Sequence, residues 1–371
     1  MDRSVGFFEG IFRLLSRIDL VLFAALLILL TLGGLTLYSA SGENMHMMTR
    51  HAIHLGLAAG VMLFASQLSS NLLNRMSVWI YAVGIILLIL VIVQGAMGKG
   101  AQRWLELGSL RFQPSEVMKL AVPMMVASYF SHKTLPPRFI DIFVALILVL
   151  IPMLLIVKQP DLGTALLVGS AGFFVIYFAG IAWKWLITVF IGVIVAAPLL
   201  FFYGMHDYQR QRVLTLLDPT SDRLGSGYHI IQSTIAIGSG GVYGKGWLNG
   251  DQSRLDFLPE RHTDFIFAVF GEEFGLLGNI LLLSIYLFII WRGLHLATKG
   301  QDTFARLLGG SLSLTFFVYL FVNTGMVSGI LPVVGVPLPL VSYGGTSLVT
   351  LMAAFGLLMG MRKRKKGYAS M

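Results

Sequence analysis

Asp264 is the carboxylate in this sequence that is best placed for acid–base chemistry. It follows Arg261 and His262 at the end of a long polar stretch and comes directly before a long apolar run. One interpretation is a helix N-terminus, where the positive end of the helix dipole favours an acidic residue. The other is a general base, which has to lie within reach of a hydroxyl proton. Position alone leaves both interpretations open.

Glu116 and Lys119 form a second candidate pair, this time inside an apolar run. They are three residues apart, so their side chains can meet on one face of a helix. The pair either neutralises itself or takes part in binding a substrate, since charges among apolar residues usually mark pairing or function. Other polar residues in or beside the apolar runs are Asp141, Asp161, Glu272, Glu273 and Asn323.

The segment 206–263 holds the largest concentration of polar residues, together with enough aromatic and aliphatic residues to bury. A structureless loop of this length is uncommon, so we expect short helices here rather than disorder. The glycine run 238–247 is not a nucleotide-binding loop, because Ser239 stands where that motif needs glycine and Gly246 where it needs serine or threonine.

No metal or cofactor site is predicted from ligand spacing. The histidines lack metal-ligand spacing, and His51 and His54, one turn apart, are interpreted as interfacial. The absence of cysteine excludes disulfides, thiol catalysis and cysteine-ligated zinc. The sequence identifies no certain cofactor and leaves open a divalent cation.

The elements that must position these residues are membrane helices. Of 371 residues, 56% are hydrophobic and 12% are charged, about half the charged fraction of an ordinary soluble domain. The net charge of +9 is spread thinly, which argues against a nucleic-acid partner. We therefore expect a polytopic membrane protein with an all-α fold and a single transmembrane domain over 1–371.

Hydrophobic runs separated by turn or charged residues predict ten transmembrane helices. They lie at 20–40, 51–68, 78–94, 115–130, 139–157, 163–182, 184–205, 264–290, 305–326 and 345–361. The segment 1–18 is predicted to be a basic amphipathic helix on the membrane surface, and no cleavage site follows the first run.

The distribution of lysine and arginine predicts that both termini face the cytoplasm. In this arrangement the inner side carries fifteen basic residues, including the tail 362–371, and the short outer loops carry five. The segment 206–263 then becomes a long outer loop between the seventh and eighth spans. The loop 95–114 places three basic residues on the disfavoured side, which suggests a function for it. The segment 333–345, broken by prolines and glycines, is expected to fold back against an outer cavity, since non-helical backbone at this depth must be buried in protein or line a cavity.

Seven segments together resemble the SEDS family (shape, elongation, division and sporulation proteins), and the resemblance covers the chain from the first span onward. They are GKGAQRW at 98–104, FQPSEVMK at 112–119, QPDLGT at 159–164, YQRQRV at 208–213, GYHIIQS at 227–233, LPERHTDFIF at 258–267 and GVPLPLVSYGG at 335–345. The histidine in PERHTD at 259–264 is more similar to the elongation branch of the family than to its division branch.

The resemblance implies a peptidoglycan glycosyltransferase that polymerises lipid II, a disaccharide-peptide on undecaprenyl pyrophosphate, on the outer face of the cytoplasmic membrane during cell elongation. It also implies a class B penicillin-binding protein as the transpeptidase partner, with other elongation-complex proteins. By the same resemblance Asp264 matches the family's essential carboxylate, and Glu116 and Lys119 match its polar pair in the fourth span.

The chemistry of such a transfer needs a base for the acceptor hydroxyl and cations for the departing pyrophosphate. Asp264 is the candidate base. Candidate phosphate partners are Arg210, Arg212, Lys245 and Arg261, and further candidate substrate-binding residues within the family motifs are Trp104, Asp161 and Ser342.

Two alternatives come from other classes of protein. A transporter that flips lipid-linked precursors would line its path with intramembrane charges, but no internal repeat is visible and the polar motifs gather on one face. A non-catalytic scaffold for the transpeptidase is the other alternative.

Overall fold

The computed structural model describes residues 17–98, 101–107, 110–204, 207–222, 225–254, 257–258 and 260–362. The amphipathic segment predicted at 1–18 and the basic tail predicted at 362–371 lie outside these ranges, except for residues 17, 18 and 362. All structural statements below concern the described residues.

A helix lies in each of the ten segments predicted as spans. These helices are α2 (Leu20–Ala40), α3 (Met45–Gln67), α4 (Ser70–Gln94), α5 (Pro114–Ser131), α6 (Phe139–Val157), α7 (Leu162–Phe178), α8 (Trp183–Leu199), α12 (Ile266–Thr298), α13 (Thr303–Val327) and α14 (Gly345–Gly360). The predicted helical membrane fold is thereby confirmed. In the described part of the chain, α2, α3, α4, α6, α12 and α13 are long and apolar enough to cross a membrane, and α7 and α14 are shorter apolar helices. Ten crossings with both termini inside remain a prediction.

Two of these helices begin several residues before the hydrophobic runs predicted for them. The side chain of Asn44 accepts a hydrogen bond from Met47 N at the start of α3, and that of Ser69 accepts one from Leu72 N at the start of α4. Such N-caps allow a helix to start in polar sequence. The prediction from hydrophobicity alone therefore placed the first residues of α3 and α4 too late in the sequence.

The helix α12 differs from the span predicted at 264–290 because it is longer and is broken at Gly275. Gly275 has φ +64°, a left-handed conformation that favours glycine. The break separates a short first part, 266–274, from a second part, 276–298. The second part has about the length that one membrane crossing needs.

The core consists of two buried apolar clusters that meet along α13. One cluster includes α2, α12, α14 and the C-terminal half of α13. The other includes α4, α5, α6, α7 and the N-terminal half of α13. The helix α13 is thus central, and residues from both halves of the chain can be positioned against it.

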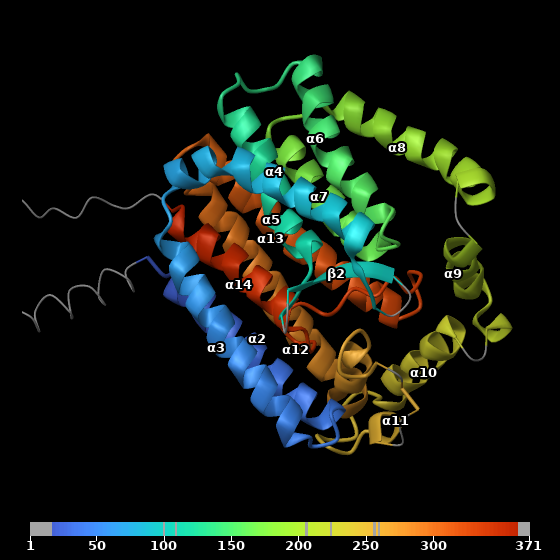
Figure 1. Cartoon of the computed structure of the whole chain (residues 1–371). Helices are drawn as coiled ribbons and strands as arrows, with labels where there is room; N and C mark the ends of the chain where they lie inside the picture. Colours follow the sequence, from blue (N-terminus) through green and yellow to red (C-terminus); the bar gives the residue numbers. More distant parts are fainter. Residues whose placement is uncertain are drawn as a thin grey trace, which may run out of the picture.

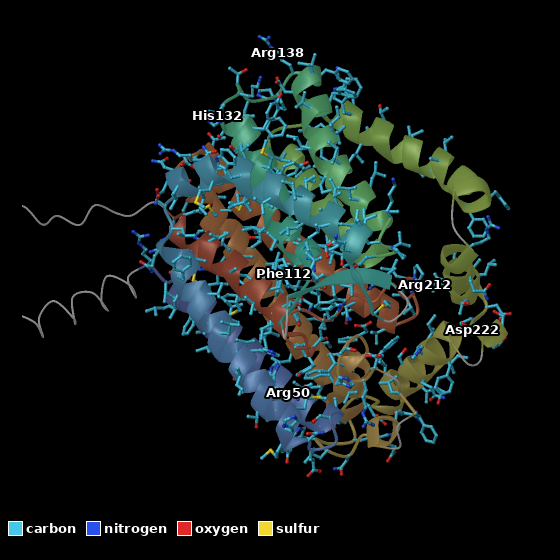
Figure 2. All side chains as sticks on the ribbon, in the orientation of Figure 1. Arg50, Phe112, His132, Arg138, Arg212 and Asp222 are labelled. Carbon is cyan, nitrogen blue, oxygen red and sulfur yellow. The ribbon has the colours of Figure 1, made fainter. Side chains whose placement is uncertain are left out.

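Contacts between helix ends indicate which loops lie at the same end of the bundle. The hydroxyl of Ser70 donates to Asp302 at 2.8 Å, which joins the starts of α4 and α13. Figure 2 shows His132 and Arg138, between α5 and α6, far from Arg50 in the first part of α3. This separation agrees with helices that alternate in direction, as the predicted topology requires.

The segment 206–263 contains the short helices that its aromatic and aliphatic residues predicted. They are α9 (Asp207–Leu217), the 3-10 turn η2 (Pro219–Ser221), α10 (Ser226–Ser239) and α11 (Asp251–Arg254), and a π-helical turn, η1 (Leu200–Gly204), precedes them. Figure 1 shows α8 diverging from the other long helices, with α9 beyond it, while α10 returns to the bundle near α12.

A small antiparallel sheet forms between α4 and α5, which the all-α prediction missed. Its strands are β1 (Ala96–Gly98), β2 (Ala101–Leu107) and β3 (Leu110–Phe112), in the order β1-β2-β3. Only Leu105, Glu106 and Leu107 alternate between apolar and polar types, and Leu105 pairs with Phe112. Alternation over so few residues is a weak signal beside the hydrophobic runs.

Asp19 ties three parts of the chain together at the opposite end from the sheet. Its carboxylate accepts Arg292 Nε at 3.0 Å and Nη2 at 2.8 Å, accepts Arg362 Nη1 at 2.9 Å, and caps α2 through Leu22 N. Burial raises the pKa of Asp19, but the hydrogen bond and charge of Arg292 and the charge of Arg362 lower it, so the net pKa lies below its ordinary value.

We predict that Asp19→Ala lowers the free energy of unfolding by about 2–4 kcal/mol, because two guanidinium groups lose their carboxylate and α2 loses its cap. Denaturant titration in detergent micelles measures this loss. Arg362→Ala is the matched control and should cost less, since Arg292 keeps both of its hydrogen bonds. Equal losses would contradict the central role of Asp19.

Candidate active site

The residues before Asp264 are held by a segment from the end of the chain. The N–H of Tyr343 donates to His262 O at 2.9 Å, and the hydroxyl of Ser342 donates to Thr263 O at 2.5 Å. The same hydroxyl accepts from Leu338 N at 2.8 Å. Ser342 therefore joins the folded-back segment 332–344 to the segment that carries Asp264.

Asn323 of α13 completes this set of hydrogen bonds. Its Nδ2 donates to Asp264 O at 2.8 Å and to Val336 O at 2.7 Å, and its side chain is fully buried. Three successive carbonyls, from residue 262 to residue 264, thus each accept a hydrogen bond from α13 or from segment 332–344. The backbone at Asp264 is fixed, while its side chain is only partly buried.

Gly335 allows segment 332–344 to pass close to the Asp264 carboxylate. A Cβ at this position would lie 3.5 Å from Asp264 Oδ2, and Gly335 has φ +74°. A larger residue would be strained by this φ and would bring a side chain against the carboxylate. A glycine here leaves space beside the candidate base.

The Glu116–Lys119 contact predicted on α5 is confirmed. Lys119 Nζ donates to Glu116 Oε1 at 2.6 Å, and both side chains are buried. The ammonium also lies 5.0 Å from the ring centroid of Tyr319 on α13. Tyr319 and Asn323 are four residues apart, one turn along the same face of α13. Tyr319, which the pair contacts, therefore lies about one helical turn from the residue that holds Asp264, about 6 Å along the axis of α13.

Asp161 lies in the turn between α6 and α7. It caps α7 by accepting from Thr164 N at 3.2 Å, and its Oδ2 accepts from Gln113 Nε2 at 3.3 Å and lies 3.6 Å from Arg103 Nε. Arg103 belongs to β2 and also donates to Pro160 O at 2.6 Å. The small sheet is anchored to the α7 N-terminus in this way, and it places Trp104, half-buried, next to Arg103.

Lys245, one of the predicted phosphate partners, is engaged by two carboxylates. Its Nζ donates to Glu272 Oε1 at 2.8 Å and to Asp251 Oδ2 at 2.9 Å. The hydrogen bonds to Glu272 and Asp251 raise the pKa of Lys245 above its ordinary value. The structure places Lys245 at the break in α12.

The three arginines predicted as phosphate partners lie in different surroundings. Arg210 donates through Nε to Phe201 O at 3.1 Å and through Nη2 to Phe202 O at 3.0 Å, so it closes the turn η1. Arg212 lies on α9 in the outlying part of the molecule, which Figure 2 shows together with Asp222. Arg261 is half-buried, with one Nη 3.9 Å from where a Cβ would lie at Gly42.

The structure thus brings Ser342 to the segment that carries Asp264, and it packs Lys119 against Tyr319, one turn from Asn323 on α13. It gives Arg210 and Lys245 other partners. Sequence reasoning noted Asn323 only as a polar residue in an apolar run and missed Tyr319, because an aromatic residue in a membrane helix carries no signal of its own. In the described ranges, no group of three or more His, Asp or Glu side chains could hold a metal ion.

A histidine on α10 packs directly against the start of α12. The ring of His229 stacks on Phe265, with the ring centroids 5.4 Å apart and 14° between the planes. Burial lowers the pKa of His229 below its ordinary value of 6.5, although the charges of Glu260 and Asp222 act in the opposite direction. His229 is therefore a neutral packing group beside the candidate base at neutral pH.

Comparison with known proteins gives matches over nearly the whole chain. A family model described as "cell cycle protein", which covers FtsW, RodA and SpoVE, matches residues 13–367. The chain is 51% identical over 350 residues to the peptidoglycan glycosyltransferase MrdB of Escherichia coli, which covers 94% of this chain and 95% of that protein. It is 35% identical over 366 residues to a probable peptidoglycan glycosyltransferase FtsW of Geobacter metallireducens, covering 95% and 96%.

Two kinds of solved structure are similar. One is a chain of a peptidoglycan synthase complex, from work on how it coordinates polymerization and crosslinking, with a TM-score of 0.80 at 33% identity and coverage of 92% and 96%. The other is the rod shape determining protein RodA of Thermus thermophilus, with a TM-score of 0.70 at 28% identity and coverage of 92% and 95%.

We predict that Asn323→Leu lowers the free energy of unfolding by about 2–4 kcal/mol, because two buried carbonyls lose their donor. Thr324→Val is the matched control, since the hydroxyl of Thr324 bonds only within α13 at Leu320 O and Phe321 O. Denaturant titration compares the two, and limited proteolysis reports whether 262–265 becomes accessible. A similar cost for both variants would contradict the assigned role of Asn323.

We also predict that His229 makes the stability depend on pH. The unfolded chain takes up a proton near the ordinary histidine pKa, while the folded chain resists it, so stabilisation is complete above 6.5 and decreases as the pH falls towards the lowered pKa. His229→Phe keeps the stacking and cannot titrate. The melting temperature of the wild type should therefore fall more than that of the variant between about pH 7.5 and pH 5.5. Parallel curves would contradict the prediction.

Proposed function

Because the chain belongs to the SEDS family, in the group of FtsW, RodA and SpoVE, we propose that it polymerises lipid II into glycan strands with Asp264 as general base. It is a peptidoglycan glycosyltransferase and a multi-pass inner-membrane protein of the elongation branch, as its 51% identity to MrdB over nearly the whole chain indicates. The lipid II substrate, the role of Asp264 and the substrate contacts below are parts of the proposal.

The observation that carries the proposal is how Asp264 is held. Its backbone carbonyl is fixed by Asn323, while its side chain is only partly buried and lies beside a glycine. Phe265, and not Asp264, occupies the N-cap position of α12. A fixed backbone with a reachable carboxylate is what a general base requires.

One carboxylate is sufficient for this reaction. The base removes the proton from the acceptor hydroxyl as that oxygen attacks the anomeric carbon of the donor sugar. The bond that breaks joins this carbon to pyrophosphate, which leaves as a good anion. Cations can stabilise that anion, so no second carboxylate is needed as a general acid.

Arg261 is the first candidate to bind the pyrophosphate, because it is the arginine or lysine nearest to Asp264 in the chain. Arg212 on α9 and Arg210 are further candidates from the same polar segment, and Arg210 also bonds the turn η1. Lys245 has a structural role instead, since it pairs with Glu272 and Asp251. Arg103 and Trp104 of β2, with Asp161, form a further candidate contact with the sugars or peptide. Ser342 is better explained as a residue that positions Asp264.

Glu116 and Lys119 are proposed to face the substrate beside Asp264. Glu116 Oε1 accepts from Lys119, whereas Glu116 Oε2 is buried without a hydrogen-bond partner among the described residues. A buried carboxylate oxygen without a donor is unfavourable. A hydroxyl or amide of a bound substrate would satisfy it.

An apolar groove of about 430 Å³ between α2, α3 and α14 is proposed to receive part of the lipid tail. It is lined by Phe23, Leu26, Leu27, Leu30, Thr31, Leu55, Gly56, Ala59 and Met352. Its α3 wall begins next to His54, whose ring packs against Gly345. Gly345 lies two residues after Tyr343, whose N–H donates to His262 O, so the groove leads towards the segment that carries Asp264.

A class B penicillin-binding protein is the proposed transpeptidase partner. The similar chain of the peptidoglycan synthase complex supports an assembly of this kind. Coupling a polymerase to a crosslinking enzyme places new strands where they are needed. Other elongation-complex proteins are proposed on the resemblance alone.

We predict that Asp264→Asn lowers polymerisation of lipid II by about 10²–10⁴-fold in the purified protein with its partner, because the amide cannot accept the proton. The fold should be retained, since the contacts of Asp264 with α13 run through its backbone carbonyl. Gel analysis of labelled glycan strands measures the activity. Asp251→Asn, a carboxylate in the same polar segment, is the matched control and should polymerise normally.

Unchanged polymerisation by Asp264→Asn would remove this residue as the base. Transfer of lipid II across vesicles without any polymer would favour the transporter. Neither activity, with a transpeptidase that still depends on this chain, would leave the scaffold.

A further inference from the structure

The break in α12 is filled by backbone from the loop that follows α10. Four hydrogen bonds between the two backbones replace those that a continuous helix would make. They run from Leu276 N to Gly241 O (3.0 Å), from Leu277 N to Val242 O (3.1 Å), from Lys245 N to Glu272 O (3.0 Å) and from Gly246 N to Glu273 O (3.0 Å). The loop 240–246 therefore acts as the missing turn of the helix.

Glu272 accepts hydrogen bonds from residues before, within and after this loop. Its side chain is fully buried, and Oε1 accepts from Lys245 Nζ at 2.8 Å, from Gln252 N at 3.2 Å and from Ser239 Oγ at 3.4 Å. These donors span residues 239–252. One carboxylate thus fixes the path of the loop before and after the turn.

Glu273 extends the same arrangement to α2. It is also fully buried, and its Oε1 accepts from Ser39 Oγ, near the end of α2, and from Leu248 N at 3.2 Å. Trp247 Nε1 donates to Leu35 O of α2 at 3.1 Å. The break in α12 is therefore fixed both to the loop and to a neighbouring long helix.

The charge of Lys245 is essential to this arrangement. A buried carboxylate is tolerated only when it is paired and hydrogen-bonded. Lys245 supplies the positive charge that Glu272 meets, and its other partner, Asp251, has a side chain that is 70% exposed. Removing Lys245 would leave Glu272 charged and buried without its cation.

The two ends of the short segment 266–274 are thus anchored separately. Asn323, Ser342 and Tyr343 hold the end next to Asp264, and loop 240–246 holds the end at Gly275. Glu272 lies eight positions after Asp264, which corresponds to about 12 Å at the rise of a helix. A shift at the break would be transmitted along this short helix to the carboxylate.

We propose that Glu272 and Lys245 are positioning residues for glycosyl transfer: their ion pair holds loop 239–252 in the break of α12 and so fixes the helix that begins two residues after Asp264. This inference rests on the proposed role of Asp264 in polymerisation. It replaces the role predicted for Lys245 from sequence, a direct contact with the pyrophosphate of the substrate.

The test compares four variants of the full-length protein with its partner. Lys245→Met removes the cation, Lys245→Arg keeps it, and Lys245→Met with Glu272→Gln removes both charges. Asp251→Asn is the control for the exposed partner. Steady-state polymerisation gives kcat and KM for lipid II, and amide hydrogen exchange of peptides containing 276–277 reports the loop-to-helix bonds.

If the ion pair positions the base, Lys245→Met should lower kcat about 10–100-fold and change KM less than about threefold. The reason is that the base moves while the substrate contacts remain. Exchange at 276–277 should be faster. Lys245→Arg and the double variant should return both quantities to within about fivefold of the wild type, since neither leaves Glu272 charged and unpaired. Asp251→Asn should stay within about twofold.

The proposal is overturned if the double variant is as impaired as Lys245→Met and KM rises in both, because Lys245 would then contact the substrate. Unchanged hydrogen exchange in Lys245→Met would also overturn it. If the wild type makes no polymer, the proposed function fails, and the exchange measurement still decides whether the ion pair holds the loop.

Discussion

The need to satisfy the backbone hydrogen bonds of irregular segments packed among the helices governs the rest of this structure. Lipid offers no donors or acceptors and the protein interior offers few, so such backbone must bond to protein. Three irregular segments meet this need by bonding to helices or to one another. Segment 262–264 bonds to α13 and to segment 332–344, and loop 240–246 bonds to the broken turn of α12. The same hydrogen bonds satisfy the backbone of these segments and hold their polar residues in place.

Buried charges in this protein are arranged by the same principle. Asp19 meets Arg292 and Arg362, Glu116 meets Lys119, and Glu272 meets Lys245. The contacts of Asp19 and the pair of Glu272 with Lys245 join separate segments of the chain. Glu116 and Lys119 are the exception, because they lie on one helix. That exception is the pair that packs against Tyr319, for which we propose that a substrate supplies the remaining partner. The partners of a buried charge therefore indicate whether it joins parts of the structure or is a candidate for substrate binding.

The outline of the fold and the position of the candidate base could be predicted from the sequence, but the surroundings of this carboxylate could not. Hydrophobic runs located ten helices, because apolar length is a local property. The position of Asp264 between a polar stretch and an apolar run marked it as a candidate. The small sheet at 96–112 and the break at Gly275 were missed, because short alternation and single glycines give weak local signals. The starts of α3 and α4 were placed late, because capping residues extend helices into polar sequence.

The sequence by itself determined that this is a helical membrane protein, which family it resembles, and which carboxylate begins the eighth apolar run, because these follow from composition and short motifs. Only the tertiary structure decided which of the basic residues take structural partners. Lys245 and Arg210 look alike as basic residues in one polar segment, yet one pairs with buried Glu272 and the other closes a π-helical turn. Tertiary structure also gave Ser342 and Asn323 their roles, since their partners at Thr263 and Asp264 are 79 and 59 residues away in the chain. A hydrogen bond over such a separation depends on how helices pack, and no local pattern records that.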